Sequence, residues 1–219
     1  MKKIILLLIG LILVAGCTNN SIKTITNEEK TTDEEFKDPK LEWCQLYNPN
    51  GFETITCVVS NPNDVDIDIT YDMVFYKAGQ EVARQSEWSN YQISPKHNDV
   101  IWANVGIPKA SDVDEIKMEN ITVTKAYNKS IDADIKYVET IGNQAYFSVE
   151  SKNKPTLNTI WFFLYNDKNN NKKCDQGELI ITDVESVLEQ DTEISIDTDV
   201  SGSKYGIDYN SYEIYYNAY

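Results

Sequence analysis

The stretch DKNNNKKCDQGE, residues 167–178, carries side-chain oxygens at regular short intervals. Counted from its first residue, positions 1, 3, 5, 9 and 12 are Asp167, Asn169, Asn171, Asp175 and Glu178. Position 7 is Lys173, whose backbone carbonyl adds one more oxygen. Six to eight hard oxygens at about 2.3–2.6 Å bind Ca²⁺, and this segment with one water supplies such a set. The spacing predicts a metal site, and the alternative is a polar hairpin tip in an Asn- and Asp-rich chain.

These positions match the ligand positions of an EF-hand calcium loop, and the segment resembles the DxNxNxxxDxGE loops of secreted bacterial modules. In those modules the loop sits on a sandwich hairpin. Position 6 is usually Gly, because the backbone there adopts a positive φ, but here it is Lys172. Lys168, Lys172 and Lys173 also offset the loop's carboxylates. The resemblance therefore implies a structural Ca²⁺ of weak, extracellular-type affinity, with a Kd of roughly 10⁻⁴–10⁻³ M.

The N-terminus, MKKIILLLIGLILVAGC, has two lysines, an apolar run and small residues before Cys17. The run is shorter than the roughly 20 apolar residues of a spanning helix, which is typical of a secretory signal. Its end, LVAGC, resembles the lipobox of prokaryotic lipoproteins. The resemblance implies a signal peptide at 1–16, a diacylglyceryl group on Cys17 and attachment to the extracytoplasmic face of the cell membrane. An uncleaved anchor and an ordinary signal peptide are the alternatives.

Residues 17–40 are polar, charged and poor in large apolar side chains, as expected of a flexible tether that follows the lipidated cysteine. The whole chain has a formal net charge of −15. Such a chain is repelled by phosphates, and no Lys/Arg cluster offsets this, so we expect no nucleic-acid partner.

From Leu41 onward, short aromatic and β-branched segments alternate with turns, which predicts an all-β fold of two tandem immunoglobulin-like β-sandwiches. The predicted strands cover residues 54–60, 64–76, 99–107, 119–127, 144–151, 159–166, 192–200 and 211–219. Two segments, 112–120 and 181–190, are candidates for single helical turns. The two halves, 41–127 and 128–219, share a strand–turn–aromatic strand–tip pattern that suggests a repeated module, with the calcium loop in the second copy.

The segment VSNPNDVDIDITYDMVFYKAGQEVA, residues 59–83, resembles the FxLYD family of small lipoprotein domains. The tip here is Phe75-Tyr76-Lys77-Ala78-Gly79, so Lys77 replaces the Asp of the family pattern. The resemblance implies an extracytoplasmic β-sandwich and no chemistry of its own.

The cysteines suggest different roles. Cys44 and Cys57 lie in strand-like segments on either side of a turn, and their pairing would close a loop that contributes about 2–4 kcal/mol. The alternative is two buried thiols. Cys174, at loop position 8, is expected to be a small buried hydrophobic group rather than a reactive thiol.

The remaining candidates are weaker. Asp64, Asp66 and Asp68 alternate with aliphatic residues, which indicates a solvated strand face or, alternatively, a second cation contact. Trp88 and Tyr91 form either an aromatic loop that binds a peptide or glycan or a cap on the sandwich end.

His97 is the one histidine, and no nucleophile or phosphate-loop motif is present, so we expect no catalytic residues and no enzyme. The sequence favours a binding, adhesion or scaffolding module that contacts a surface protein or glycan. A solute- or cofactor-binding protein with a pocket between its modules is the alternative.

Overall fold

The computed structural model describes residues 36–48, 51–142, 144–151, 158–187, 192–197 and 209–218. Chain contacts define a compact unit from Phe36 to Tyr219. The predicted signal peptide, the lipidated Cys17 and most of the tether lie outside the described residues. Within the described ranges, no helix has the length and apolar character needed to span a membrane.

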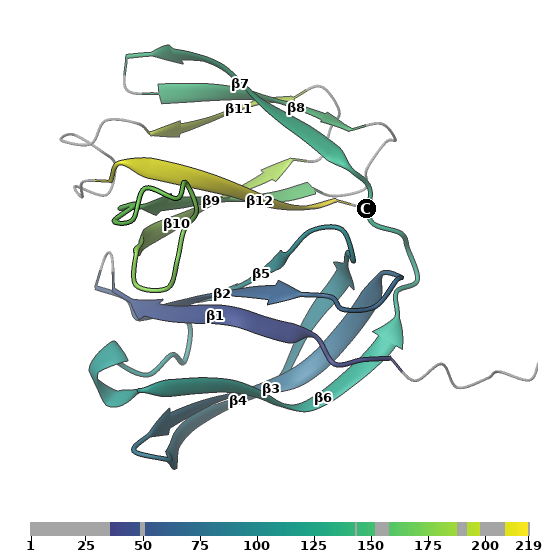
Figure 1. Cartoon of the computed structure of the whole chain (residues 1–219), viewed down its shortest axis with the longest axis vertical. Coiled ribbons are helices and arrows are strands. Elements are labelled where there is room, and N and C mark those ends of the chain that lie inside the picture. Colours follow the sequence, from purple (N-terminus) through teal and green to yellow (C-terminus); the bar gives the residue numbers. More distant parts are fainter. Residues whose placement is uncertain are drawn as a thin grey trace, which may run out of the picture. The chain divides into compact units, whose positions relative to one another are not determined.

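The regular secondary structure of the described residues is almost entirely β-strand, which confirms the all-β prediction (Figure 1). The first half contains β1 (Lys40–Tyr47), β2 (Thr54–Ser60), β3 (Ile67–Lys77), β4 (Gln80–Ile93), β5 (Asp99–Ala103), the 3₁₀ turn η1 (Ala110–Asp112) and β6 (Glu115–Lys125). The second half contains β7 (Ala133–Ile141), β8 (Gln144–Ser151), β9 (Asn158–Tyr165), β10 (Leu179–Val187), β11 (Thr192–Asp197) and β12 (Ser211–Ala218).

The strand order of the second half repeats that of the first. The first half forms the three-stranded sheets β1-β2-β5 and β4-β3-β6, and the second forms β7-β8-β11 and β10-β9-β12. Adding six to each strand number of the first pair gives the second pair. All of these pairings are antiparallel. The two halves therefore share one strand order.

Two hydrophobic cores account for the order of the sheets. One core packs β1-β2-β5 against β4-β3-β6, with Ile55 and Cys57 of β2 against Tyr71 of β3. The other joins the two halves, because Val58 of β2 and Phe163 of β9 belong to the same cluster. Alternate residues of β2 therefore face different cores, and the strand is buried on both faces.

The same burial on two faces explains the continuous apolar run of β9. Phe162 packs on Phe147 of β8, with ring centroids 5.3 Å apart, whereas Phe163 packs on Trp43 of β1 at 5.7 Å. Phe162 and Phe163 are both fully buried, and each such side chain contributes roughly 2–3 kcal/mol through removal of apolar surface from water.

The prediction of helical turns at 112–120 and 181–190 is wrong for most of the described residues in these segments. Residues 115–120 belong to β6 and residues 181–187 to β10, while η1 accounts only for Asp112 of the first segment. Pairing decided both cases: β6 adds to the edge of β3, and β10 adds to the edge of β9. The solvent-facing side of an edge strand weakens its apolar pattern, so the sequence predicted β6 only from residue 119 and read 181–190 as a helical turn.

The chain becomes part of the first core before Leu41. Phe36 packs against that core, and the Lys37 N–H donates to Asn63 Oδ1 at 2.8 Å. The Asn63 side-chain amide in turn donates to the Lys37 carbonyl at 2.9 Å. The end of the expected tether, from Phe36 on, is therefore held on the first half.

Cys44 and Cys57 form a disulfide with an S–S distance of 2.01 Å. They are directly opposite each other in the β1–β2 ladder and lie in the first core. The bond therefore fixes the register of an edge strand.

Candidate functional site

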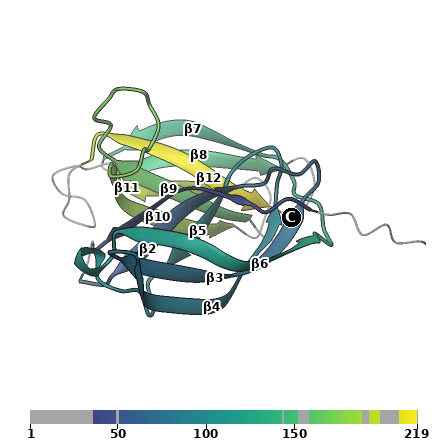
Figure 2. The same cartoon turned by 60° about the horizontal axis from the view of Figure 1, so that its bottom comes forward.

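The loop between β9 and β10 carries the predicted metal ligands. At its base the Asn166 N–H donates to the Glu178 carbonyl at 3.1 Å, and the Asp167 N–H donates to Asn210 Oδ1 at 2.9 Å. Figure 2 shows this loop in green, extending beyond the strand ends. The loop is thus closed where it leaves and rejoins the sheet.

The first and last residues of the loop organise its backbone with their carboxylates. Asp167 accepts hydrogen bonds from the N–H groups of Asn171 (3.2 Å) and Lys172 (2.9 Å). Glu178, which is largely buried, accepts from the N–H groups of Lys168 (3.0 Å) and Asp175 (3.2 Å), one on each oxygen. Both carboxylates therefore point into the loop rather than to solvent.

The middle ligands converge on Asp175. The side-chain amides of Asn169 and Asn171 both donate to Asp175 Oδ2 at 2.8 Å. Their Oδ1 atoms accept the N–H groups of Asn171 (3.0 Å) and Lys173 (2.8 Å). Each amide oxygen keeps a second lone pair that a cation can use.

The backbone takes the conformation that a calcium loop needs at position 6. Lys172 has φ of 61°, in the left-handed region where Gly is usual. Asn170 has φ of 59°, and Asn tolerates this region better than most residues. Lys172 therefore adopts the left-handed backbone conformation of the glycine that usually occupies position 6.

The donor set fits calcium only if its asparagines take part. Among the described residues, no three His, Cys, Asp or Glu side chains gather closely enough to hold a metal ion by themselves. Two amides, three carboxylates and the Lys173 carbonyl together give the oxygen-rich set that Ca²⁺ requires. The Lys168 ammonium is turned away to the Gly177 carbonyl, at 2.8 Å.

Cys174 anchors the loop to the neighbouring strand. Its side chain is buried, as predicted, and its N–H donates to Glu213 Oε2 of β12 at 2.8 Å. Burial raises the pKa of the Cys174 thiol, and the nearby carboxylates of Glu213 and Glu178 add to this. A thiol with a raised pKa is a poor nucleophile, which agrees with a packing role.

The end of the loop is clasped by β1 of the first half. Gln45 Nε2 donates to the Leu179 carbonyl at 2.6 Å, and the Gly177 N–H donates to Gln45 Oε1 at 2.9 Å. Gln176 Nε2 also donates to the Cys44 carbonyl at 3.2 Å. In Figure 1 the green loop before β10 reaches toward β1. The candidate metal loop is therefore hydrogen-bonded directly to β1, the strand that carries Cys44 of the disulfide.

A groove rich in tryptophan lies where β4, β5, β9 and β10 come together. Three of the chain's four tryptophans line it: Trp88 from β4, Trp102 from β5 and Trp161 from β9. Its volume is about 730 Å³. Trp102 keeps 40 % of its surface exposed, and Val105 at the rim keeps 80 %. The sequence had singled out Trp88 but had no means to bring the other two beside it.

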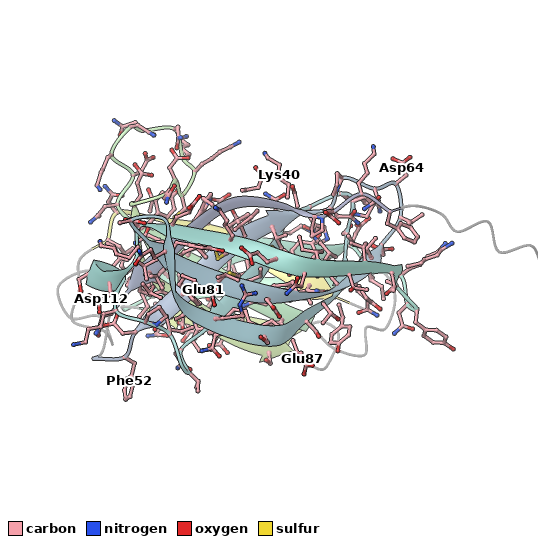
Figure 3. All side chains as sticks on the ribbon, turned by 90° about the horizontal axis from the view of Figure 1, so that it is seen from below. Lys40, Phe52, Asp64, Glu81, Glu87 and Asp112 are labelled. Carbon is pink, nitrogen blue, oxygen red and sulfur yellow. A yellow bond between two sulfur atoms is a disulfide. The ribbon has the colours of Figure 1, made fainter. Side chains whose placement is uncertain are left out.

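A β-bulge positions Trp88 on this groove. Ser86 and Glu87 together oppose Asp72 of β3, because the register shifts between the pairs on either side. Glu87 has φ of 62°, and its N–H donates to Asp72 Oδ1 at 3.3 Å. Bulges re-aim side chains next to binding sites, and Trp88 here packs edge-on against Tyr71 at 6.3 Å. Figure 3 labels Glu87 along this strand.

Asp99, at the start of β5, is a buried carboxylate that sequence reasoning did not identify. It is 3 % exposed, and Asn90 Nδ2 donates to its Oδ2 at 3.2 Å. Burial raises its pKa from the usual 3.8 to about 6, although hydrogen bonds from the Val100 backbone and from Asn90 and Asn217 partly oppose the rise. Asp99 Oδ1 has no hydrogen-bond partner among the described residues.

Arg84, the chain's one arginine, bonds three carboxylates on the outer face of β4-β3-β6. Its guanidinium lies 2.8 Å from Asp72, 2.7 Å from Glu81 and 2.9 Å from Glu119. The Arg84 hydrogen bond lowers the pKa of Glu81, and bonds from Tyr76 and then Arg84 lower that of Glu119. This network is structural and lies outside the loop.

The other predicted candidates have separate contacts. The predicted strand 64–76 begins too early: Asp64 and Asp66 precede β3 in a turn, and only Asp68 lies in the strand. Asp66 accepts a hydrogen bond from Ser130, and Asp68 from the Gln92 N–H at 2.8 Å. Asp64 is exposed (Figure 3).

The two remaining aromatic candidates lie apart from the tryptophan groove. His97 packs on Tyr216 with ring centroids 4.7 Å apart. Tyr91, 61 % exposed, is not among the residues that line the groove.

No known family model, curated protein or solved structure matches this chain. The sites described above therefore rest on the chain's own chemistry.

Proposed function

We propose that this chain is a lipoprotein, anchored through Cys17 on the extracytoplasmic face of the cell membrane, that acts as a non-enzymatic binding, adhesion or scaffolding module. Its two halves are immunoglobulin-like β-sandwiches, the first of them similar to FxLYD domains. The lipobox-like LVAGC supports the anchor. The Cys44–Cys57 disulfide suits an oxidising compartment outside the cytoplasm.

The observation that carries the proposal is the geometry of the loop. Asp167 and Glu178 turn their carboxylates inward, and Lys172 takes the positive φ of a calcium loop. We propose that Asp167, Asn169, Asn171, Asp175 and Glu178, with the Lys173 carbonyl, hold a structural Ca²⁺. A bound cation offsets the mutual repulsion of the three carboxylates and so stabilises the native loop by mass action.

The clasp between the loop and β1 gives the ion a role beyond its own loop. The side-chain amides of Gln45 and Gln176 connect the end of the loop to the first half through hydrogen bonds with backbone groups. An ordered loop keeps these bonds in place, so calcium supports the packing of one half on the other. The module then presents a fixed surface, as a binding protein requires.

The tryptophan groove supports the alternative of a solute-binding protein. Residues of both halves line it, with Trp102 from the first half and Trp161 from the second. Ligand sites are concave, largely apolar and provided with a few polar groups, and this groove fits that description. A small solute and a protruding group of a larger partner both fit its size.

Thermal melting tests the proposal. The purified full chain is melted with 5 mM Ca²⁺ and with excess chelator, and the Asp167→Ala/Glu178→Gln variant is treated in the same way. We expect calcium to raise the melting temperature of the wild type and to leave that of the variant unchanged. Equal melting temperatures of the wild type with and without calcium would contradict a structural ion.

A further inference from the structure

Three tryptophan side chains are the largest groups that line the tryptophan groove. Trp88, Trp102 and Trp161 come from three different sheets and surround the same space. The face of an indole ring is negative, and among aromatic side chains tryptophan attracts cations most strongly. The groove is therefore built from the side chain best suited to a cationic group.

The charges at the groove also favour a cationic ligand. Of the described residues that line it, Glu87 is the only one with a charged side chain. Glu87 is exposed and forms no ion pair within the described part of the chain. The net charge of −15 adds a negative field that concentrates cations and repels anions.

Gln85 and Asn90, the two amide side chains that line the groove, are engaged with the protein itself. Gln85 Nε2 donates to the Gly106 carbonyl at 2.7 Å. Asn90 accepts from the Tyr71 hydroxyl at 2.8 Å and donates to Asp99 and to the Val100 carbonyl. A sugar needs several free polar groups to bind its hydroxyls, whereas a quaternary ammonium has no N–H to satisfy.

We propose that this groove binds an organic cation of the quaternary-ammonium class. Its cationic head lies against the indole faces of Trp88, Trp102 and Trp161, and the Glu87 carboxylate balances its charge. The proposal rests on the proposed function as a binding module and names the chemistry of its ligand. A free solute and a choline headgroup on a lipid surface both present this chemistry.

Binding of choline to the full chain, followed by tryptophan fluorescence and calorimetry, tests the proposal. The matched probe is 3,3-dimethyl-1-butanol, which has the shape of choline with a neutral carbon in place of the nitrogen. We expect choline to bind at least fivefold more tightly than the neutral alcohol. Trp102→Ala and Glu87→Gln should each weaken choline binding about threefold or more, as expected for loss of one cation–π contact or one charge.

Two variants serve as matched controls. Tyr127→Ala removes an aromatic ring that is 96 % exposed and outside the groove, and Glu139→Gln removes an exposed carboxylate of β7. Neither should change choline affinity. Binding to phosphatidylcholine vesicles that is lost in Trp102→Ala would support the proposal and identify a lipid source, while binding of free choline alone would identify a solute.

Other results would contradict the proposal that the ligand is a cation. Equal affinity for choline and the neutral alcohol would remove the role of charge, and absence of choline binding would refute the site. Binding of a neutral oligosaccharide instead, lost in Trp102→Ala, would overturn the ligand class and leave the binding function standing. Thermal melting with and without calcium tests the proposed function separately. Failure of choline binding can therefore be told apart from failure of the proposed function.

Discussion

Replacing Asp99 by asparagine should stabilise this protein at neutral pH. Asp99 is 3 % exposed, one of its oxygens has no partner among the described residues, and burial raises its pKa to about 6. In the unfolded chain the same carboxyl titrates near its usual value of 3.8. Between these values the native state binds a proton that the unfolded state has released, so stability falls as pH rises.

The magnitude follows from the two pKa values. Each tenfold difference in proton affinity corresponds to about 1.4 kcal/mol, so the charged carboxylate costs about 3 kcal/mol of unfolding free energy above pH 6. An asparagine side chain at this position keeps a similar shape and carries no charge. The gain from Asp99→Asn should therefore approach about 3 kcal/mol at pH 8 and shrink toward zero near pH 4.

Urea unfolding of wild type and Asp99→Asn, followed by tryptophan fluorescence from pH 4 to pH 8, measures this difference. Asp64→Asn is the matched control, because Asp64 is exposed. The control should give a small difference that does not vary with pH. A difference between Asp99→Asn and wild type that is constant across the range would refute the account of a buried, proton-binding carboxylate.

Three further changes have defined outcomes. Replacing both Cys44 and Cys57 by Ser should lower the unfolding free energy by about 3 kcal/mol, the chain-entropy value for a loop of this length, and urea unfolding would show a smaller loss if the bond contributes little. Lys172→Gly should stabilise the chain by up to about 1 kcal/mol in the same assay, since Gly adopts a positive φ without steric cost; a destabilised variant would contradict the loop geometry. Arg84→Met should lower the melting temperature, and added salt should reduce that loss by screening the carboxylates of Asp72 and Glu119 from each other; a loss independent of salt would argue for packing instead.

Local patterns in the sequence predicted the strands that are rich in β-branched and aromatic residues. The bounds of β2 and β8 match their predicted segments, and those of β9 and β12 match within one residue, because β-branched and aromatic residues cluster there. The start of β6, residues 115–118, was misread as part of a helical turn because an edge strand with a polar face lacks a strong apolar pattern. Only the pairing with β3 reveals it as β6.

The candidate sites also differ in how far they could be predicted from sequence, because some are formed by one segment and others by residues far apart in the chain. The loop at 167–178 is local, so its spacing alone was enough to predict candidate ligands, and the positive φ of Lys172 agrees with the expected turn. The tryptophan groove depends on strands far apart in sequence, and the bulge at Glu87 that positions Trp88 has no signal in composition. Asp99 was equally hidden, because its burial depends on contacts with Asn90 and with Asn217, more than a hundred residues later.

Calorimetric titration of Ca²⁺ into the purified full chain, beside the Asp167→Ala/Glu178→Gln variant, tests the central claim most directly. We expect the wild type to bind one ion with a Kd of about 1 mM or tighter, and the variant to give no heat beyond dilution. A flat titration of the wild type, or equal binding by the variant, would contradict a calcium site at this loop.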